Sequence, residues 1–158
     1  MSNVTLARPR RMRGKSKFCI VASKFNAPYV QGLIDHAEKE LRGLARNATI
    51  AIHRVPGSFE IPVAAREIAL RGKADAIIAC GVIMQGETNH AKNLSRSVTD
   101  ALQRVAIDYG VPVINVVLSF DNETQARERC LENKINRGTE AGRAAVEIAN
   151  LMSELRSG

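Results

Sequence analysis

The stretch from Asp75 to His90 reads D-A-I-I-A-C-G-V-I-M-Q-G-E-T-N-H. Its apolar beginning, residues 76–80, is typical of a β-strand that is buried on both faces. The chain then passes Gly81 and Gly86 and ends in polar residues at the expected start of a helix. This succession predicts a strand of a parallel sheet, followed by a loop and a helix.

The loop that ends at His90 combines two features of a reactive site. Free backbone N–H groups at a helix start attract anions, and histidine is the side chain that most readily exchanges protons near neutral pH. Open α/β sheets bind their ligands at the carboxyl ends of their strands. The spacing fits a helix-capping loop with an incidental histidine equally well.

The rest of the chain alternates between strand and helix patterns around this stretch. Apolar runs at 17–22, 48–55 and 113–120 predict three further strands. Helical spacing of apolar residues predicts amphipathic helices over residues 30–41, 64–69, 94–109 and 141–155, with a short helix at 122–131. The order β-α-β-α-β-α-β-α-α with right-handed crossovers predicts a three-layer α/β/α fold, in which helices flank a parallel sheet of four strands.

Several polar residues fit the ends of these helices. Asn26 and Ser58 are expected N-caps, and Asn122 to Gln125 has the spacing of a capping box. Gly110 is expected to end the helix that precedes it, because glycine adopts left-handed geometry without strain. The segment 132–138 breaks the helical pattern and is expected to separate the last two helices.

Composition limits the class of protein. The 158 residues suffice for one domain, and an apolar fraction of 45% suffices for a core. The three cysteines are widely spaced and form no C-x-x-C motif, which argues against a disulfide framework or a zinc site and favours a reducing cytoplasm. The sequence offers no metal site, no apolar run of membrane-spanning length and no secretory signal pattern.

Basic residues gather at the N-terminus. Residues 1–16 are predicted to be a basic, flexible tail, and residues 17–158 a single α/β domain. The first 17 residues hold six of the 23 Lys and Arg residues and none of the 16 acidic ones, so the domain itself is nearly neutral. Such a tail can touch nucleic acid, but a solvated terminus is the commoner role, and nucleic acid is therefore not expected as a partner.

Three further residues stand out by position. Phe25 follows the first strand, where it fits stacking on a planar ring or, more commonly, a plug at the core edge. Glu60 lies early in a predicted helix, where it fits binding of a hydroxyl group or the ordinary electrostatics of a helix start. Asn115 interrupts an apolar strand and needs a hydrogen-bond partner, which is a ligand, a neighbouring subunit or backbone.

Three segments together resemble the lumazine synthase family of riboflavin biosynthesis: K-F-N at 24–26, V-P-G-S-F-E-I-P at 55–62 and G-V-I-M-Q-G-E-T-N-H at 81–90. Three later segments follow in matching order, namely G-V-P-V-I at 110–114, E-R at 128–129 and N-R-G-T-E-A at 136–141. The resemblance covers the chain from about Phe18 onward. It implies a flavodoxin-like sheet and an enzyme, a transferase.

The resemblance implies the reaction and the ligands. Members condense 5-amino-6-(D-ribitylamino)uracil with 3,4-dihydroxy-2-butanone 4-phosphate to give 6,7-dimethyl-8-ribityllumazine, phosphate and water. No cofactor and no metal are implied. The two substrates are small molecules, the protein is expected to be a cytoplasmic homo-oligomer built on pentamers, and a shell of sixty subunits is one known form.

The resemblance also implies a role for each matching residue. Phe25 would stack on the pyrimidine ring, Asn26 beside it would also bind substrate, and His90 would move protons. The remaining substrate-binding residues would contact the uracil and ribityl groups (Ser58, Phe59, Glu60, Val82, Ile83, Met84) or the phosphate side (Glu87, Thr88, Arg129). Arg129 is also expected to take part in catalysis as the phosphate clamp. Arg137 stands where the family usually has a lysine near the ring. Asn115, Arg129 and Arg137 would come from the adjacent subunit.

The sequence departs from the family pattern near the histidine. Gln85 stands where an arginine is common, Ala91 and Lys92 replace an aromatic–acidic pair, and Asn115 replaces a residue that is often aromatic or otherwise apolar. These departures leave an alternative open, a non-catalytic homologue that binds flavin or lumazine. A nucleic-acid role of the basic tail and a flavodoxin-like electron carrier are less favoured, the latter because the first strand is not followed by a phosphate loop.

Overall fold

The central sheet has four parallel strands. The computed structural model describes residues 2–158. The strands are β1 (Lys17–Ser23), β2 (Thr49–Val55), β3 (Ala76–Met84) and β4 (Val113–Phe120), in the order β2-β1-β3-β4. Since every pairing is parallel, all four carboxyl ends lie at the same end of the sheet.

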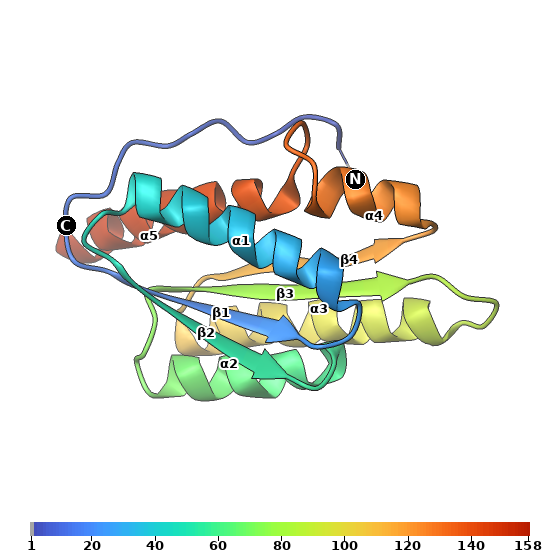
Figure 1. Cartoon of the computed structure of the whole chain (residues 1–158). Coiled ribbons are helices and arrows are strands. Elements are labelled where there is room, and N and C mark those ends of the chain that lie inside the picture. The colour runs from blue at the N-terminus through green and yellow to red at the C-terminus, as the bar shows by residue number, and fades with distance from the viewer. Residues whose placement is uncertain (1) are drawn as a thin grey trace.

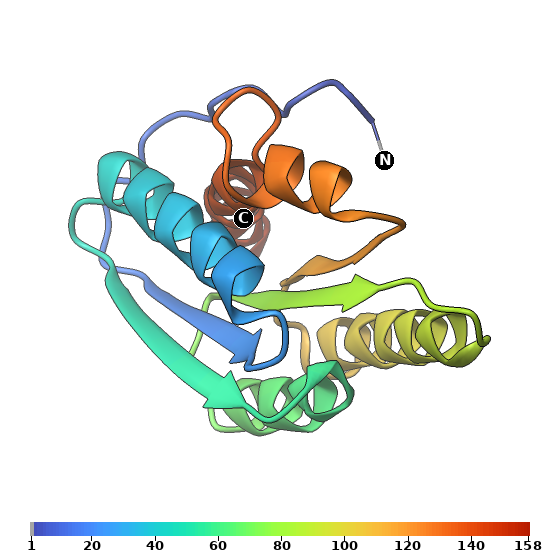
Figure 2. The ribbon, with the colours of Figure 1, turned by 45° about the vertical axis from the view of Figure 1, so that its right-hand side comes forward.

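Helices cover both faces of this sheet. On one face lie α1 (Ala27–Leu44), α4 (Glu123–Cys130) and α5 (Arg137–Ser157), and on the other lie α2 (Ile61–Leu70) and α3 (His90–Tyr109) (Figures 1 and 2). A short 3-10 turn, η1 (Ser58–Glu60), precedes α2. The predicted three-layer α/β/α fold of flavodoxin-like type is confirmed.

Alternation along the strands divides the core into two layers. Phe18 and Ile20 of β1 face α1 and α5, whereas Cys19 and Val21 between them face the layer of α2 and α3. All four side chains are at most 3% exposed. Burial on both faces explains why the sequence shows continuous apolar runs rather than alternation.

Several predicted boundaries differ from the structure, and two of these differences have a clear cause. The strand expected at 76–80 continues to Met84, because β4 pairs with β3 as far as Met84 opposite Phe120. The last helix starts at Arg137 rather than near residue 141, because the Asn136 side chain accepts hydrogen bonds from the backbone N–H groups of Gly138 and Thr139. Arg137 is therefore the first residue of a helix, and the expected break is shorter than predicted.

The structure confirms some of the predicted helix caps and not others. Gly110 (φ 66°) ends α3 and the Asn122 side chain accepts from the Gln125 N–H at 3.0 Å, as predicted. Asn26 occupies the predicted N-cap position of α1, but its side chain makes no capping hydrogen bond, and the expected cap at Ser58 is wrong. Asn26 is instead bonded to a neighbouring strand, and Ser58 opens η1 rather than α2.

Residues 2–16, the N-terminal segment, run along the outer layer of α1 and α5 (Figure 1). The Met12 N–H donates to the carbonyl of Leu44 at 2.8 Å, and Met12 lies against the core. Arg8 Nη2 lies 2.7 Å from Glu40 Oε1. These contacts fix where the segment lies in the structure, while its flexibility in solution stays a prediction.

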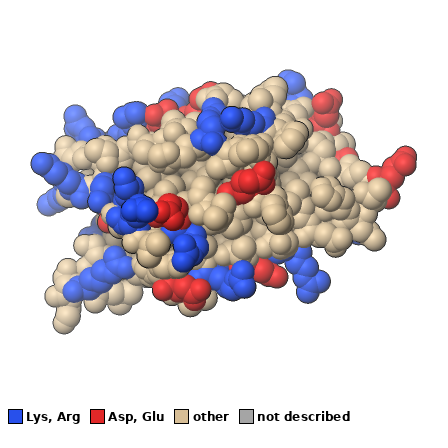
Figure 3. Space-filling model, turned by 90° about the horizontal axis from the view of Figure 1, so that it is seen from below, with Lys and Arg blue, Asp and Glu red and all other residues tan. Residues whose placement is uncertain are grey.

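Basic side chains on the α2 and α3 side lie mostly toward the end where the strands begin (Figure 3). The carboxyl ends of the strands lie at the opposite end. No helix within residues 2–158 is long and apolar enough to cross a membrane. No group of three His, Cys, Asp or Glu side chains in this range is arranged to hold a metal ion.

Candidate active site

A cavity of about 390 Å³ opens at the carboxyl ends of the strands. It brings together the loop after β1, the turn after β2, the end of β3 and the start of α3. The lining residues are Phe25, Asn26, Gly57, Ser58, Phe59, Glu60, Val82, Ile83, Met84, His90 and Leu94. Nine of these eleven were predicted from the sequence, and they come from three segments that are far apart in the chain.

Two aromatic rings stand at this cavity. Phe25 is 70% exposed and Phe59 is 68% exposed, so neither plugs the core edge. A Cβ atom at Gly57 would lie only 3.2 Å from Cδ2 of Phe25, which means that a side chain here would push the ring away. The missing side chain at Gly57 leaves the Phe25 ring room beside the turn, where it can stack on a planar ligand.

The floor of the cavity depends on close contact between β3 and η1. A Cβ atom at Gly81 would lie 2.6 Å from Ser58 Oγ and 3.3 Å from Ser23 Oγ. Both serines are buried, and the Ser23 hydroxyl has no hydrogen-bond partner within residues 2–158. Glycine at position 81 therefore lets η1 rest on the sheet, which brings Phe59 and Glu60 to the cavity.

Asn26 connects the loop after β1 to the end of β3. It adopts a left-handed conformation (φ 56°, ψ 44°), the only positive φ among the non-glycine residues described. Its Nδ2 donates to the carbonyl of Val82 at 2.7 Å. Asparagine tolerates this conformation better than most residues do. The bond fixes the Phe25 loop relative to the β3 backbone that lines the cavity.

His90 is the first residue of α3 and lines the cavity. Its backbone N–H lies 3.4 Å from Thr88 Oγ1, and no side chain caps the helix at Asn89. Open N–H groups at this helix start agree with an anion seat. Glu87 and Thr88 are exposed and do not line the cavity itself, so their phosphate role stays a prediction.

Asn115, Arg129 and Arg137 lie apart from this cavity. Asn115 and Arg137 line a second cavity of about 260 Å³, beside the edge strand β4. Arg129, on α4, is joined to the same region through Asn3, which accepts from its Nη2 at 3.3 Å. One chain therefore presents two separate groups of predicted site residues.

The partners of Asn115 belong to this chain. Its Oδ1 accepts from the Val117 N–H at 3.0 Å and its Nδ2 lies 3.4 Å from Thr99 Oγ1. The sequence left three kinds of partner open: a ligand, a neighbouring subunit or backbone. In the structure Asn115 bonds to backbone and to one hydroxyl group of α3. The side chain is nevertheless exposed, so its remaining hydrogen-bonding capacity faces outward.

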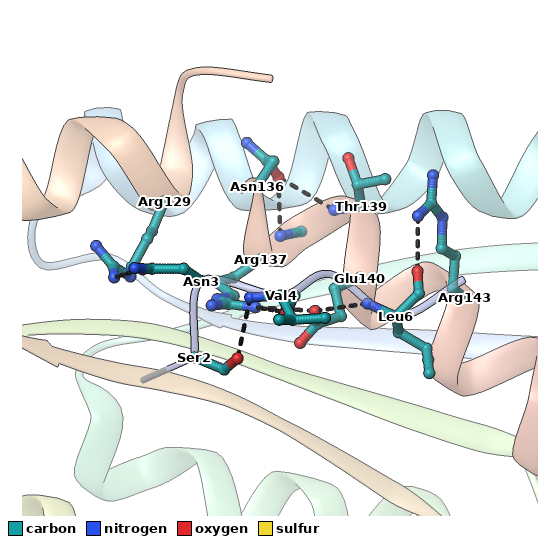
Figure 4. Close-up of polar contacts among 11 residues, drawn as sticks. Ser2, Asn3, Val4, Leu6, Arg129, Asn136, Arg137, Thr139, Glu140 and Arg143 are labelled. Atoms are coloured by element: carbon teal, nitrogen blue, oxygen red, sulfur yellow. Dashed lines mark hydrogen bonds and ion pairs between the residues drawn. The ribbon is translucent and has the colours of Figure 1, made fainter. Parts of the chain in front are cut away.

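Arg137 is buried and Arg129 is half-buried, and both are incompletely bonded (Figure 4). The Arg137 side chain is 6% exposed and its Nη1 donates to Glu140 Oε2 at 2.8 Å, but its Nε and Nη2 have no partner within residues 2–158. The Arg129 side chain is 13% exposed, its Nη1 lies 3.6 Å from Glu128 Oε2, and its Nε has no partner in the described part of the chain. Such donors favour an anion, since guanidinium groups bind phosphate oxygens well.

A family model described as 6,7-dimethyl-8-ribityllumazine synthase matches residues 15–153. The chain belongs to the 6,7-dimethyl-8-ribityllumazine synthase family. A relative of that name from Paraburkholderia phymatum is 41% identical, over 84% of this chain and 75% of the relative. Another, from Burkholderia multivorans, is 39% identical, over 86% of this chain and 77% of the relative. The family predicted from the motifs is confirmed.

Two lining residues of this lumazine synthase family member were not predicted. Gly57 lies inside the matching V-P-G-S-F-E-I-P motif, but its spacing alone does not reveal that it borders the Phe25 ring. Leu94 lies one helical turn after His90, on the same side of α3. That i, i+4 spacing is the signal that could have found it.

The cysteines offer this lumazine synthase family member no nucleophile. All three are buried and unpaired. Burial, together with the nearby Cys130, raises the pKa of Cys80 to about 12, and burial raises the pKa of Cys130 to about 12. Burial also raises the pKa of Cys19. These thiols stay protonated at neutral pH, and a thiol attacks only as its thiolate.

Proposed function

We propose that this chain condenses 5-amino-6-(D-ribitylamino)uracil with 3,4-dihydroxy-2-butanone 4-phosphate to 6,7-dimethyl-8-ribityllumazine in riboflavin biosynthesis. The observation that carries the proposal is the cavity in which Phe25, Phe59, Glu60 and His90 meet. It offers an aromatic surface for a pyrimidine, a carboxylate for hydroxyl groups and a proton carrier. The family membership supports the same reaction.

The uracil substrate would occupy this cavity. Phe25 would stack on its ring, and the backbone of residues 82–84 would contact the ring edge. Ser58, Phe59 and Glu60 would hold the ribityl chain, whose hydroxyl groups would donate to the Glu60 carboxylate. Asn26 would keep the Phe25 loop in place through its bond to Val82.

The chemistry requires proton transfers and orientation. The uracil amine attacks the ketone and an imine forms with loss of water, phosphate then leaves, and the ribitylamino nitrogen closes the ring with loss of a second water. His90 would move protons in these steps, which typically contributes about 10²–10⁴-fold. Holding the two substrates in contact would supply much of the remaining acceleration.

The phosphate half would be completed by a second subunit. Glu87 and Thr88, just before α3, would face the phosphate from one chain, and Arg129 of its neighbour would clamp it. Arg137 and Asn115 would come from the same neighbour, with Arg137 near the ring. Their separation from His90 in a single chain supports this arrangement. We therefore propose a homo-oligomer built on pentamers, with a sixty-subunit shell as one possible form.

The protein would work in the cytoplasm on small-molecule substrates. The support for this location is the set of three buried cysteines without a disulfide, which suits a reducing compartment.

Incubation of the purified protein with both substrates tests the proposal. We expect an absorbance of the lumazine product together with equimolar release of inorganic phosphate. Binding of the lumazine without phosphate release would favour the alternative, a non-catalytic homologue. This alternative is retained because the sequence departs from the family pattern at Gln85, Ala91 and Lys92.

A further inference from the structure

The tip of the N-terminal segment, residues 2–4, lies over the Arg129 and Arg137 side chains (Figure 4). Asn3 Oδ1 accepts from Arg129 Nη2 at 3.3 Å, and the carbonyl of Val4 accepts from Arg137 Nη1 at 3.4 Å. Ser2 and Val4 line the 260 Å³ cavity together with Asn115 and Arg137. The tip thus occupies the surface that the proposed function assigns to phosphate.

The chain just behind the tip is held much more firmly. The Leu6 N–H donates to Glu140 Oε2 at 3.0 Å, and the Leu6 carbonyl accepts from Arg143 Nη1 at 2.7 Å. Two residues further on, Arg8 pairs with buried Glu40. The segment is therefore anchored from Leu6 onward, while its tip is held by two long hydrogen bonds.

The tip does not satisfy the arginines that it covers. It offers them an amide oxygen and a carbonyl oxygen, both neutral. Among the described residues 2–158, Arg129 Nε, Arg137 Nε and Arg137 Nη2 stay without partners. Hydrogen bonds between a guanidinium and an anionic oxygen are roughly twice as strong as neutral ones. A phosphate group would therefore bind this pair better than the tip does.

We propose that residues 2–4 form a displaceable cover over the Arg129–Arg137 pair, which the phosphate of the second substrate must push aside. The inference rests on the proposed function, because that function assigns Arg129 to phosphate and brings Arg137 to the same site. The cover lowers the affinity of the site for phosphate and leaves the uracil cavity untouched, since none of its residues lines that cavity. Displacement of the cover is therefore a step of its own in the binding of the phosphate substrate.

The test uses the full oligomeric protein, inorganic phosphate as the probe and titration calorimetry as the readout. Removal of residues 2–5 should tighten phosphate binding by about three- to tenfold, which is what one or two weak neutral hydrogen bonds supply. Asn3→Ala, which keeps the chain length, should tighten it about twofold. Arg129→Ala should abolish the gain from the deletion.

Asn47→Ala is the matched control. Asn47 Nδ2 donates to the Arg13 carbonyl at 3.3 Å, so this variant also removes one amide hydrogen bond to the N-terminal segment, but far from the arginines. It should leave phosphate affinity unchanged. In steady-state kinetics the deletion should lower KM for the phosphate substrate and leave KM for the uracil substrate unchanged.

Unchanged or weaker phosphate binding after the deletion, in assemblies of unchanged native mass, would overturn the cover. An equal gain in Asn47→Ala would also overturn it, because the effect would then come from general loosening of the segment. Calorimetry with inorganic phosphate does not depend on turnover, so loss of the proposed synthase activity would be seen separately from loss of the cover.

Discussion

At the scale of single residues, the proposed function assigns proton transfer to His90, the only titratable side chain besides Glu60 that lines the cavity of about 390 Å³. We expect His90→Ala to lower kcat by about 10²–10⁴-fold, the usual contribution of a proton-transferring group, with little change in KM. Steady-state kinetics with both substrates measures this. His53→Ala, which removes an exposed histidine on β2, is the matched control and should behave as wild type. Wild-type turnover in the His90 variant would show that another group moves the protons.

Asn26 allows backbone strain and side-chain bonding to be separated. Asn26→Gly keeps the left-handed backbone at no steric cost and loses only the bond to Val82. Asn26→Ala loses the bond to Val82 and also strains the left-handed backbone. We therefore expect it to be about 1–2 kcal/mol less stable than Asn26→Gly. Chemical unfolding measures this difference.

Both Asn26 variants should raise KM for the uracil substrate, because the Phe25 loop is no longer tied to β3, while KM for the phosphate substrate should not change. Equal stability of the two variants would show that the left-handed conformation carries no strain. An unchanged KM for the uracil substrate would show that the bond to Val82 does not position the loop.

The predictable site residues share one property, since each lies in a motif whose order matches the family. Phe25, Glu60 and His90 were found in this way, and the cavity unites them. The contact between Gly81 and Ser58 could not be predicted, because it depends on how closely η1 rests on the sheet. The actual bond of Asn26 was missed for a related reason. Sequence shows that asparagine is next to a helix start, but not that Val82 of a distant strand lies within reach.

At the scale of secondary structure, buried Glu40 connects three elements. It lies on α1 and accepts from Arg143 of α5 at 2.6 Å and from Arg8 of the N-terminal segment at 2.7 Å. Burial raises the pKa of Glu40, but the hydrogen bonds from Arg8 and Arg143 outweigh burial and hold its pKa below the ordinary value. Ionised Glu40 therefore stabilises the fold above the ordinary pKa of about 4.3. This stabilisation is lost as the pH falls through the lowered pKa.

We expect Glu40→Gln to destabilise the protein by about 1–3 kcal/mol at pH 7, the range for hydrogen bonds to charged groups. The difference from wild type should shrink as the pH falls below about 4, since Glu40 is then protonated. Thermal unfolding at pH 7 and pH 3 measures both effects. Glu38→Gln is the control, because Glu38 pairs only with exposed Arg42 and should change stability by less than about 1 kcal/mol. A gap that persists undiminished at pH 3 would assign the stabilisation to packing rather than charge.

Element types and order were predictable because the buried strands β1 and β3 leave a clear apolar run, and the exposed edge strand β2 still carries isoleucines at alternating positions. Element ends were less predictable, since they depend on partners elsewhere. β3 reaches Met84 only because β4 continues beside it to Phe120. Arg137 belongs to α5 only because the Asn136 side chain caps that helix. The path of the N-terminal segment could not be predicted, because it is held mostly by scattered polar pairs such as Arg8 with Glu40, with Met12 as a single apolar contact to the core.

At the scale of the whole molecule, the two groups of site residues raise the question of how a site is completed. His90 lines one cavity and Arg137 lines another, on opposite sides of the β3–β4 pair of strands. In a ring, every chain presents both surfaces to its neighbours. The surface with His90 on one chain can therefore meet the surface with Arg137 on the next. We therefore expect a native mass of at least five chains of 17.2 kDa each.

Subunit mixing tests whether each site is shared between neighbours. His90→Ala and Arg129→Ala should each be nearly inactive alone, since one lacks the proton carrier and the other the phosphate clamp. After joint dissociation and reassembly, some interfaces receive His90 from one chain and Arg129 from the next, and these sites are intact. We expect partial recovery of activity, to at most about one quarter of wild type in random mixtures, since both contributing chains must be of the right kind.

Mixed assembly is verified by native mass spectrometry, and mixing two batches of the same mutant is the control. No recovery in verified mixed assemblies, or activity in a species of 17.2 kDa, would mean that a single chain brings His90 and Arg129 to the same substrate.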